Sequence, residues 1–180
     1  MKKLKNIINH ILENKKSKKI NLFNELHNLK FEAIKTFEEV KDIVKNSNPN
    51  KEENKGFWLF DEGFNQSSDL YRDYKNVNRK PSYMQYCAVK YNDQIIGLLA
   101  YSLKYEEENY SPSIHIFDIQ TLSNYGGCLK AYFDFFEDLA KKNNKKYLTL
   151  MVYESSLYKI YEKYGFIRNF KEYNSMYKTV

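Results

Sequence analysis

The feature that most constrains the fold is a strand–helix–strand pattern in the C-terminal half of the chain. Residues 114–122 predict a strand, residues 126–142 follow a helical period with one apolar side, and residues 147–153 (YLTLMVY) are almost continuously apolar. A run of that kind is typical of a strand buried on both faces of a sheet. Two strands joined by one helix predict a parallel, right-handed crossover.

Antiparallel strands are expected on both sides of this crossover. Two apolar runs separated by the sequence Asn92-Asp93-Gln94 predict a β-hairpin, and the chain ends in two further runs of strand character. These four strands cover residues 86–91, 95–103, 166–173 and 175–180. A short helix over 155–164 precedes the last two, and Gly165 follows it as a left-handed cap. The expected fold is therefore α/β, with a mixed, mostly antiparallel central sheet and helices on both faces.

The N-terminal half has weaker patterns. Residues 19–23 are compatible with a short strand, and an apolar stripe further on predicts a helix. The stripe consists of Phe31, Ile34, Phe37, Val40 and Val44. Another amphipathic helix is expected over residues 3–14. Because 180 residues hold one substantial core, we expect a single domain over residues 19–180, preceded by a basic extension over residues 1–18.

Positive charge is concentrated at the N-terminus. The net charge is +6, and residues 1–19 account for all of it with seven lysines and one glutamate. Three arginines occur against 26 lysines. Arginine is the usual reader of base edges, so no sequence-specific nucleic acid is expected as a partner. A different main function, contact of the basic extension with an acidic surface, RNA or anionic lipid, stays open.

Composition also bears on compartment, membrane and metal. The longest uncharged apolar run, near residues 95–103, is about half of the roughly 20 residues that a membrane span needs, so no span is expected. Two cysteines are too few for a disulfide framework, which favours a reducing cytoplasm. The histidines and cysteines show no metal-ligand spacing, so no metal is expected.

Two adjacent glycines, Gly126 and Gly127, lie where the strand over 114–122 passes into the helix. Without a Cβ atom the backbone can approach a ligand closely, and the free N–H groups of a helix start favour a phosphate. A tight strand-to-helix turn explains the same pair without any ligand. The pattern is neither G-x-G-x-x-G nor G-x-x-x-x-G-K-[ST], so it predicts no dinucleotide or nucleoside triphosphate site.

The motif YEKYGF at residues 161–166 follows an apolar strand and a short helix near the C-terminus. With the hairpin, the strand–Gly–Gly–helix turn and the strand over 147–153 in the same order, the chain resembles the GCN5-related N-acetyltransferase (GNAT) superfamily, best over residues 84–180. Members of this family often end in a strand, a short helix, Y-x-x-x-G-F and two strands. The resemblance implies a GNAT-like fold, acetyl-CoA as cosubstrate, and direct transfer of an acetyl group to a primary amine of a small molecule or peptide.

The resemblance also implies where acetyl-CoA binds. Its pyrophosphate would lie on backbone amides at the helix start, and its pantetheine arm between the splayed strands 114–122 and 147–153. The implied cofactor-binding residues are Thr121, Leu122, Asn124, Tyr125, Gly126, Gly127, Cys128, Ser155 and Tyr158. The family's phosphate loop is usually Q/R-x-x-G-x-G/A, whereas here Ser123 replaces the first residue and Cys128 the last. This departure leaves a second interpretation open, a catalytically weak GNAT-fold binding or regulatory module.

Two residues form the expected catalytic pair. Tyr161 matches the family's tyrosine that acts as general acid to the CoA thiolate, with a core tyrosine as the alternative. Asp118 is the candidate base, because the family often places an acid on that strand and apolar neighbours should raise its pKa. An exposed or lysine-paired aspartate is the alternative. Strand alternation should turn His115 to the opposite face from Asp118, which makes it the weaker candidate base.

The acceptor is suggested by three consecutive glutamates, residues 106–108, in a loop that commonly borders the acceptor cleft in this family. An acidic rim would attract a cationic amine such as a polyamine, an aminoglycoside or a lysine-bearing peptide. A solvated run of charges is the alternative interpretation. A homodimer is also compatible with the sequence.

Overall fold

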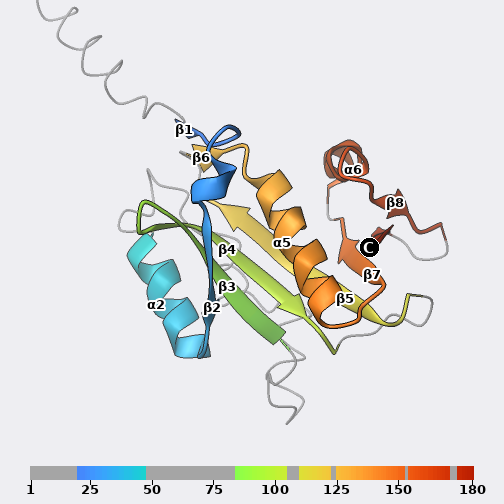
Figure 1. The fold of residues 1–180 in the computed structure, drawn as a ribbon, viewed down its shortest axis with the longest axis horizontal. Coiled ribbons are helices and arrows are strands. Elements are labelled where there is room, and N and C mark those ends of the chain that lie inside the picture. Colours follow the sequence, from blue (N-terminus) through green and yellow to red (C-terminus); the bar gives the residue numbers. More distant parts are fainter. Residues whose placement is uncertain (1–19, 48–83, 105–109, 123–124, 153, 171–173) are drawn as a thin grey trace, which may run out of the picture.

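The computed structural model describes residues 20–47, 84–104, 110–122, 125–152, 154–170 and 174–180. Most of its strands form a seven-stranded sheet with the order β2-β3-β4-β5-β7-β9-β8 (Figure 1). These strands are β2 (Lys30–Ile34), β3 (Met84–Tyr91), β4 (Gln94–Ser102), β5 (Ser113–Thr121), β7 (Tyr147–Met151), β8 (Ile167–Arg168) and β9 (Ser175–Thr179). Within this sheet β5 and β7 pair in parallel and the other neighbours pair antiparallel. The expected mixed, mostly antiparallel sheet is confirmed.

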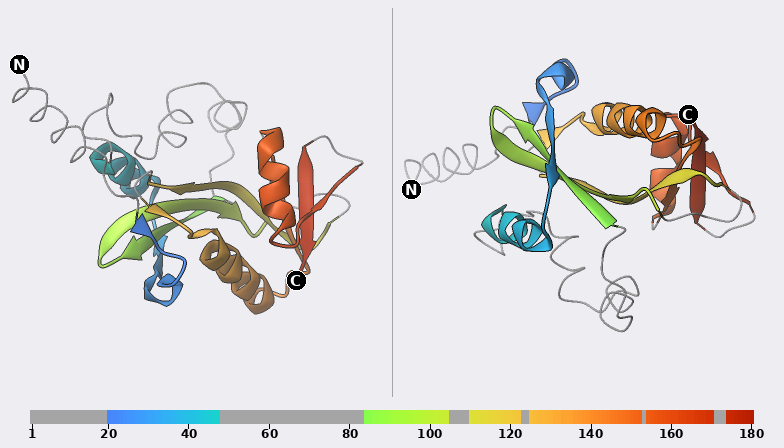
Figure 2. Two further views of the ribbon diagram at one scale, coloured as in Figure 1. Left: turned by 90° about the horizontal axis from the view of Figure 1, so that it is seen from above. Right: turned by 60° about the horizontal axis from the view of Figure 1, so that its bottom comes forward.

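Helices cover both faces of the sheet, with α2 on one face and α5 on the other (Figure 2). The helices are the 3₁₀ helix η1 (Leu26–Asn28), α2 (Phe37–Ser47), α5 (Leu129–Lys142) and α6 (Ser155–Glu162). Val40 of α2 packs with Leu98 of β4 in one buried cluster. Phe133 of α5 belongs to the larger cluster, together with Ile114 and Leu148 of the sheet. The prediction of helices on both faces is confirmed.

The parallel crossover and the hairpin lie where the sequence predicts them. The crossover is β5, α5 and β7, and its strands pair from Ser113 with Tyr147 to Ile116 with Leu150. The hairpin of β3 and β4 turns through Asn92 and Asp93, whose φ angles are 49° and 61°. Two successive positive φ angles are typical of the type I′ turn, which matches the twist of the strands.

The predicted helix over the stripe from Phe31 to Val44 begins too early. Lys30–Ile34 is strand β2, which pairs with β3, and α2 begins at Phe37. Hydrogen bonds around Thr36 and Glu39 mark the start of α2: the Thr36 hydroxyl oxygen accepts from the Glu39 amide at 3.2 Å, and the Glu39 carboxylate accepts from the Lys35 amide at 3.4 Å. The pattern T-x-x-E marks a helix start, so the residues before Thr36 can adopt the extended conformation of a strand.

The predicted helix over 126–142 also begins too early. Residues Tyr125–Gly126 form a short strand, β6, which pairs in parallel with another short strand, β1 (Ile20–Asn21). Gly127 follows with a φ of +81°, a left-handed conformation that ends any continuous helix at this point. The helix α5 therefore starts at Leu129, and the expected strand over 19–23 is reduced to two residues outside the main sheet.

Several expectations lie outside the described residues, among them the helix over 3–14, the extension over 1–18 and the glutamates at 106–108. The two final strands are present, and within the described residues of the first of them β8 covers Ile167–Arg168. Among the described residues, no helix is both long enough and apolar enough to cross a membrane.

Candidate active site

A β-bulge in β5 determines which side chains share a face. Ala100 of β4 lies opposite Asp118, and the next residue, Tyr101, lies opposite Ile116. Phe117 is thus the extra residue of the bulge, which kinks the strand and changes its alternation.

The bulge corrects the expected placement of His115. Ser102, two residues after Ala100 on β4, lies opposite His115. Residues two apart on a strand share a face, so His115 and Asp118 lie on the same face rather than on opposite ones. His115 is buried, and its Nδ1 lies 2.9 Å from the Thr149 hydroxyl of β7. This pair escaped sequence reasoning, although both residues lie on the strands of the predicted crossover.

Beyond the bulge, β5 and β7 separate, and we call this region the β5–β7 splay. Their pairing ends at Ile116 and Leu150, whereas β5 continues to Thr121 paired with β4. Figure 1 shows the two strands diverging toward the end at which α5 begins. Along the last part of β5, one edge of the backbone therefore has no partner among the described strands. The resemblance to the GNAT superfamily implies such a splay between residues 114–122 and 147–153.

Asp118 of β5 and Tyr161 of α6 lie within electrostatic range of each other. Burial raises the pKa of the Asp118 carboxyl to about 7, against an ordinary value of 3.8. Burial also raises the pKa of the Tyr161 phenol, and the charge of Asp118 raises it further. At neutral pH the phenol keeps its proton, while the carboxyl is close to half ionised. The same pair can therefore supply a proton donor and a proton acceptor.

The position of Tyr161 is fixed by its ring contacts and its backbone. Its ring lies with its centroid 6.0 Å from that of Phe133 and 6.1 Å from that of Phe166. Its carbonyl oxygen accepts from the amides of Tyr164, at 2.9 Å, and Phe166, at 3.2 Å. Gly165, between these two, has a φ of +87°, which allows the tight turn after α6.

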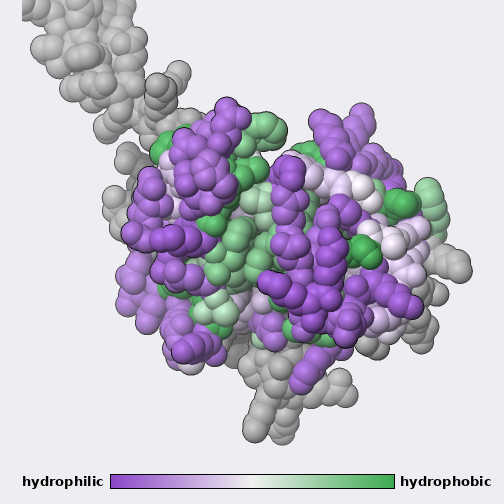
Figure 3. Space-filling model, viewed as in Figure 1, coloured by the Kyte–Doolittle hydropathy of each residue, from purple (hydrophilic) through white to green (hydrophobic). Residues whose placement is uncertain are grey.

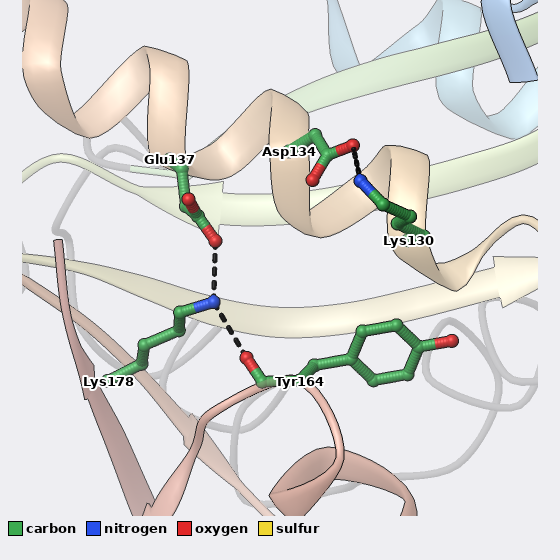
Figure 4. A network of polar contacts seen from close by, with 5 residues as sticks. All are labelled: Lys130, Asp134, Glu137, Tyr164 and Lys178. Carbon is green, nitrogen blue, oxygen red and sulfur yellow. Dashed lines mark hydrogen bonds and ion pairs between the residues drawn. The ribbon is translucent and has the colours of Figure 1, made fainter.

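A lysine of β9 ties this turn to α5 (Figure 4). Lys178 Nζ donates to the carbonyl oxygen of Tyr164 at 2.6 Å and to Glu137 Oε1 at 2.5 Å. A separate pair, Lys130 with Asp134, lies nearer the start of the same helix. Lys178 and Glu137 are mostly buried, so this ion pair is screened less than a surface pair. The turn that follows Tyr161 is thus held from both α5 and β9.

The backbone amides at the end of β5 point in two directions: one is hydrogen-bonded within the protein, and another points toward the β5–β7 splay. Leu122 N–H donates to the Ile96 carbonyl at 2.8 Å, and Tyr125 N–H donates to the Leu122 carbonyl at 2.9 Å. Neither is left for a ligand, in contrast to the expectation for Leu122. Amides alternate in direction along a strand, so the Thr121 amide points to the opposite edge, toward the splay.

The start of α5 holds the remaining candidate ligand residues. Cys128 is the N-cap, and its side chain makes no capping hydrogen bond, so the first-turn amides have no side-chain acceptor at that position. Burial raises the pKa of the Cys128 thiol, which keeps the thiol protonated. Tyr125 is buried, and its hydroxyl donates to Gln94 Oε1 at 3.1 Å, so its side chain is structural. Asn124 lies outside the described residues.

The other two expected ligand residues lie on α6. Ser155 is exposed at the first position of the helix. Tyr158 donates from its hydroxyl to Asn174 Oδ1 at 3.0 Å, and the Arg168 guanidinium lies 4.3 Å from its ring centroid. Tyr158 thus connects α6 to the C-terminal strands. No group of three or more histidine, cysteine or acidic residues that could hold a metal occurs in the described part of the chain.

A hollow of about 360 Å³ lies elsewhere, between η1, β2 and the outer side of α5. Apolar surface is visible along this boundary in Figure 3. Phe31 and Phe135 stack there with their centroids 4.6 Å apart, and Asp134 and Asp138 line the rim. Neither Asp118 nor Tyr161 lines the hollow, so it is separate from the candidate active site.

Comparison with solved structures identifies the fold. A GNAT-family acetyltransferase from Listeria monocytogenes 4b F2365 is similar with a TM-score of 0.56 and 14% identity, over 84% of this chain and 95% of that chain. Tetrahymena GCN5 is similar with a TM-score of 0.51 and 12% identity, over 84% and 96% of the two chains. A protein chain of the KacTA–DNA complex is similar with a TM-score of 0.51 and 13% identity, over 84% and 92%.

No protein-family model and no curated protein matches the sequence. The likeness is therefore one of structure rather than of sequence. It shows that this chain has the GNAT fold.

Proposed function

We propose that this protein is an acetyl-CoA-dependent N-acetyltransferase that acts on a primary amine of a small molecule or peptide. The observation that carries the proposal is that Asp118 and Tyr161 lie within electrostatic range of each other, each with a raised pKa. A proton acceptor and a proton donor at one site are what transfer from a thioester to an amine requires. The GNAT fold supports the same activity.

The chain's own residues fit acetyl-CoA at the splay. The Thr121 amide points toward the edge that β7 leaves open, which suits the amide groups of a pantetheine arm. The first turn of α5 offers amides without a side-chain cap, which suits a pyrophosphate. When bound, acetyl-CoA supplies the activated acetyl group.

Asp118 serves as the base in this proposal. A protonated amine is not a nucleophile, so its proton must leave before the nitrogen attacks the thioester carbonyl. Asp118 takes that proton, directly or through water, and its pKa of about 7 suits a base that works near neutral pH.

Tyr161 serves as the acid. As the new C–N bond forms and the C–S bond breaks, the thiolate sulfur leaves with the electron pair, and Tyr161 donates its phenolic proton to it. Burial raises the pKa of Tyr161, so the proton is present at the start of each turnover. The proton that Asp118 has taken then passes through water to the tyrosinate, which restores the pair, and the second proton of the amine nitrogen leaves to solvent as the amide forms.

Ligand binding is the first test of the proposal. Acetyl-CoA is titrated against the full chain by calorimetry and thermal shift, and saturable binding is expected. Ligand at about 100 times its Kd stabilises a protein by about 2.7 kcal/mol, which gives a clear thermal shift. Neither heat nor shift at millimolar acetyl-CoA would overturn the proposal.

Turnover is the second test, with thiol release measured over a panel of primary amines. The panel contains a polyamine, an aminoglycoside and a lysine-bearing peptide, and acetylation of at least one amine nitrogen, identified by mass, is expected. Binding without turnover of any amine would favour the alternative, a GNAT-fold binding or regulatory module.

A further inference from the structure

Residues 20–29, which we call the N-terminal strap, lie along the loop that leads into α5. The strap begins with β1, which pairs in parallel with β6, Ile20 with Tyr125 and Asn21 with Gly126. Its next residue, Leu22, donates from its amide to the Gly126 carbonyl at 2.9 Å. Figure 1 shows β1 beside β6 just before α5 begins. The strap thus adds a strand to a loop of residues 125–128, which we call the α5 entry loop.

The strap also explains why residue 127 is glycine. A Cβ atom at Gly127 would lie 2.6 Å from Asn21 Oδ1, which is closer than Cβ atoms come in proteins, and 3.0 Å from the Phe23 nitrogen, which is a tight contact. The same Oδ1 accepts from the Phe23 amide at 3.1 Å, which holds the turn of the strap in place. Two features therefore favour glycine at residue 127: the strap leaves little room for a side chain, and the φ angle is +81°.

The other part of the strap is anchored in the core. Leu22 is fully buried, and Leu29 is nearly so. The carboxylate of Glu25 accepts a hydrogen bond from the Tyr91 hydroxyl of β3. The Tyr91 ring in turn lies with its centroid 6.4 Å from that of Tyr125 in the entry loop. The strap is thus fixed to the hairpin at one point and to the entry loop at another.

We propose that the N-terminal strap positions the α5 entry loop for the pyrophosphate of acetyl-CoA, with Asn21 as its positioning residue. This inference rests on the proposed function. Two glycines give a loop many backbone conformations, and ordering them on ligand binding costs affinity. The strap orders this loop in the free protein, because β1 pairs along it and Asn21 contacts Gly127. The first-turn amides of α5 then already point toward the pyrophosphate position before acetyl-CoA binds.

The test is a comparison of acetyl-CoA binding and kinetics in the full chain. Asn21→Ala removes the acceptor for the Phe23 amide, and because the Asn21 residue is exposed the variant should fold. We expect the Kd and the KM for acetyl-CoA to rise roughly 3- to 10-fold, which is the effect of one lost hydrogen bond. The kcat at saturating acetyl-CoA and the KM for the amine should change less than about twofold, since Asn21 touches no reacting group.

Matched variants separate this role from a structural one. Asn21→Ser keeps a side-chain oxygen that can accept from the amide two residues on, so it should restore most of the affinity. Asn24→Ala, at an exposed position of the same strap, should bind as the wild type does. Tyr91→Phe releases the strap from the hairpin and should give the same separation of KM from kcat, which keeps the test valid if Asn21→Ala does not fold.

The outcomes are distinguishable. A wild type that binds no acetyl-CoA overturns the proposed function and the inference with it. A wild type that binds, with folded Asn21→Ala and Tyr91→Phe equally tight, overturns the inference alone. The third outcome is a general loss in the variants: a lower kcat, a higher KM for both substrates and a lower urea midpoint. That result would mean that the strap only stabilises the fold, and it would also overturn the inference.

Discussion

The Asp118 carboxylate lies close enough to the Tyr161 phenol for its charge to raise the pKa of that phenol. The two residues come from β5 and α6. The bulge at Phe117 places Asp118 on the same face of the sheet as His115. Ionisation of Asp118 disfavours ionisation of Tyr161, since the two negative charges would repel each other. The stable state near neutral pH is a protonated tyrosine beside a carboxyl that titrates, which is the arrangement that acid–base catalysis needs.

Tyr161→Phe should lower kcat roughly 10- to 1000-fold, since it removes the proton that we assign to the departing thiolate. The Kd for acetyl-CoA should change little, because the ring and its contacts with Phe133 and Phe166 stay in place. Steady-state kinetics and calorimetry measure the two quantities. Tyr164→Phe is the matched control: that side chain packs on Phe133, and Lys178 binds its backbone carbonyl rather than its hydroxyl. An unchanged kcat in Tyr161→Phe would remove this residue from the chemistry.

The pH dependence of kcat/KM should show an acidic limb near pH 7. Asp118 must be ionised to act as a base, and the pKa of its carboxyl is about 7, so activity should fall about tenfold per pH unit below that value. No limb from Tyr161 is expected in the neutral range, because the pKa of its phenol is raised above the ordinary value of 10.0.

The variant that tests this assignment is Asp118→Asn. It should lower kcat/KM by roughly 100-fold or more and abolish the limb near pH 7. His115→Gln is the comparison, since His115 shares the face of Asp118 and lies against Thr149. Persistence of the limb in Asp118→Asn together with its loss in His115→Gln would transfer the role of base to the histidine.

The free energy of unfolding should also depend on Asp118. The pKa of its carboxyl is raised on folding from 3.8 to about 7, so between these values the folded chain binds more protons than the unfolded chain. The free energy of unfolding therefore falls as pH rises through this window, by at most about 1.4 kcal/mol per unit, and the whole loss is present above pH 7. Asp118→Asn lacks this loss, so its stability relative to the wild type should increase from pH 4 to pH 7.

Urea unfolding at intervals from pH 4 to pH 8.5 measures this difference. Asp42→Asn, at an exposed position of α2, controls for the loss of one carboxylate. A difference between Asp118→Asn and the wild type that stays constant over the whole range would mean that Asp118 ionises as freely in the folded chain as in the unfolded one.

Features that depend on residues close together in the sequence could be predicted, whereas features that depend on contacts between distant residues could not. The crossover, the hairpin and the YEKYGF turn follow from local apolar periods and turn residues, and all three are present. The start of α2 could also have been predicted, because Thr36 and Glu39 have the T-x-x-E spacing of a helix start, and the Thr36 hydroxyl oxygen accepts from the Glu39 amide.

The bulge and the strap could not be predicted in the same way. The extra residue Phe117 is defined only by the register of β5 against β4, and one residue of register turns every later side chain to the other face. The pairing of Ile20 with Tyr125 joins segments more than one hundred residues apart, and no local period reports such a contact. The error over His115 and the early helix start at residue 126 both follow from these long-range pairings.

Gly97→Ala should destabilise the fold at the end of β5, because there is no room for a Cβ atom at this glycine of β4. That atom would lie 2.5 Å from the Tyr132 hydroxyl oxygen and 3.1 Å from Val89 Cβ. Tyr132 is fully buried, and its hydroxyl is hydrogen-bonded to the Thr121 hydroxyl at 2.9 Å. The Tyr132 side chain therefore cannot move away freely from a new Cβ atom. Overpacking of this kind costs about 1–3 kcal/mol in the free energy of unfolding, which urea titration measures.

Tyr132→Phe supplies the second arm of this test, since it deletes the oxygen atom that the new Cβ atom would meet. On its own it should also destabilise, because the Thr121 hydroxyl loses its partner. In the double variant the cost of Gly97→Ala should therefore be smaller than in the wild type, with a coupling of roughly 1 kcal/mol. Strictly additive costs would show instead that Val89 and the backbone of β4, rather than the Tyr132 hydroxyl, exclude a side chain at residue 97.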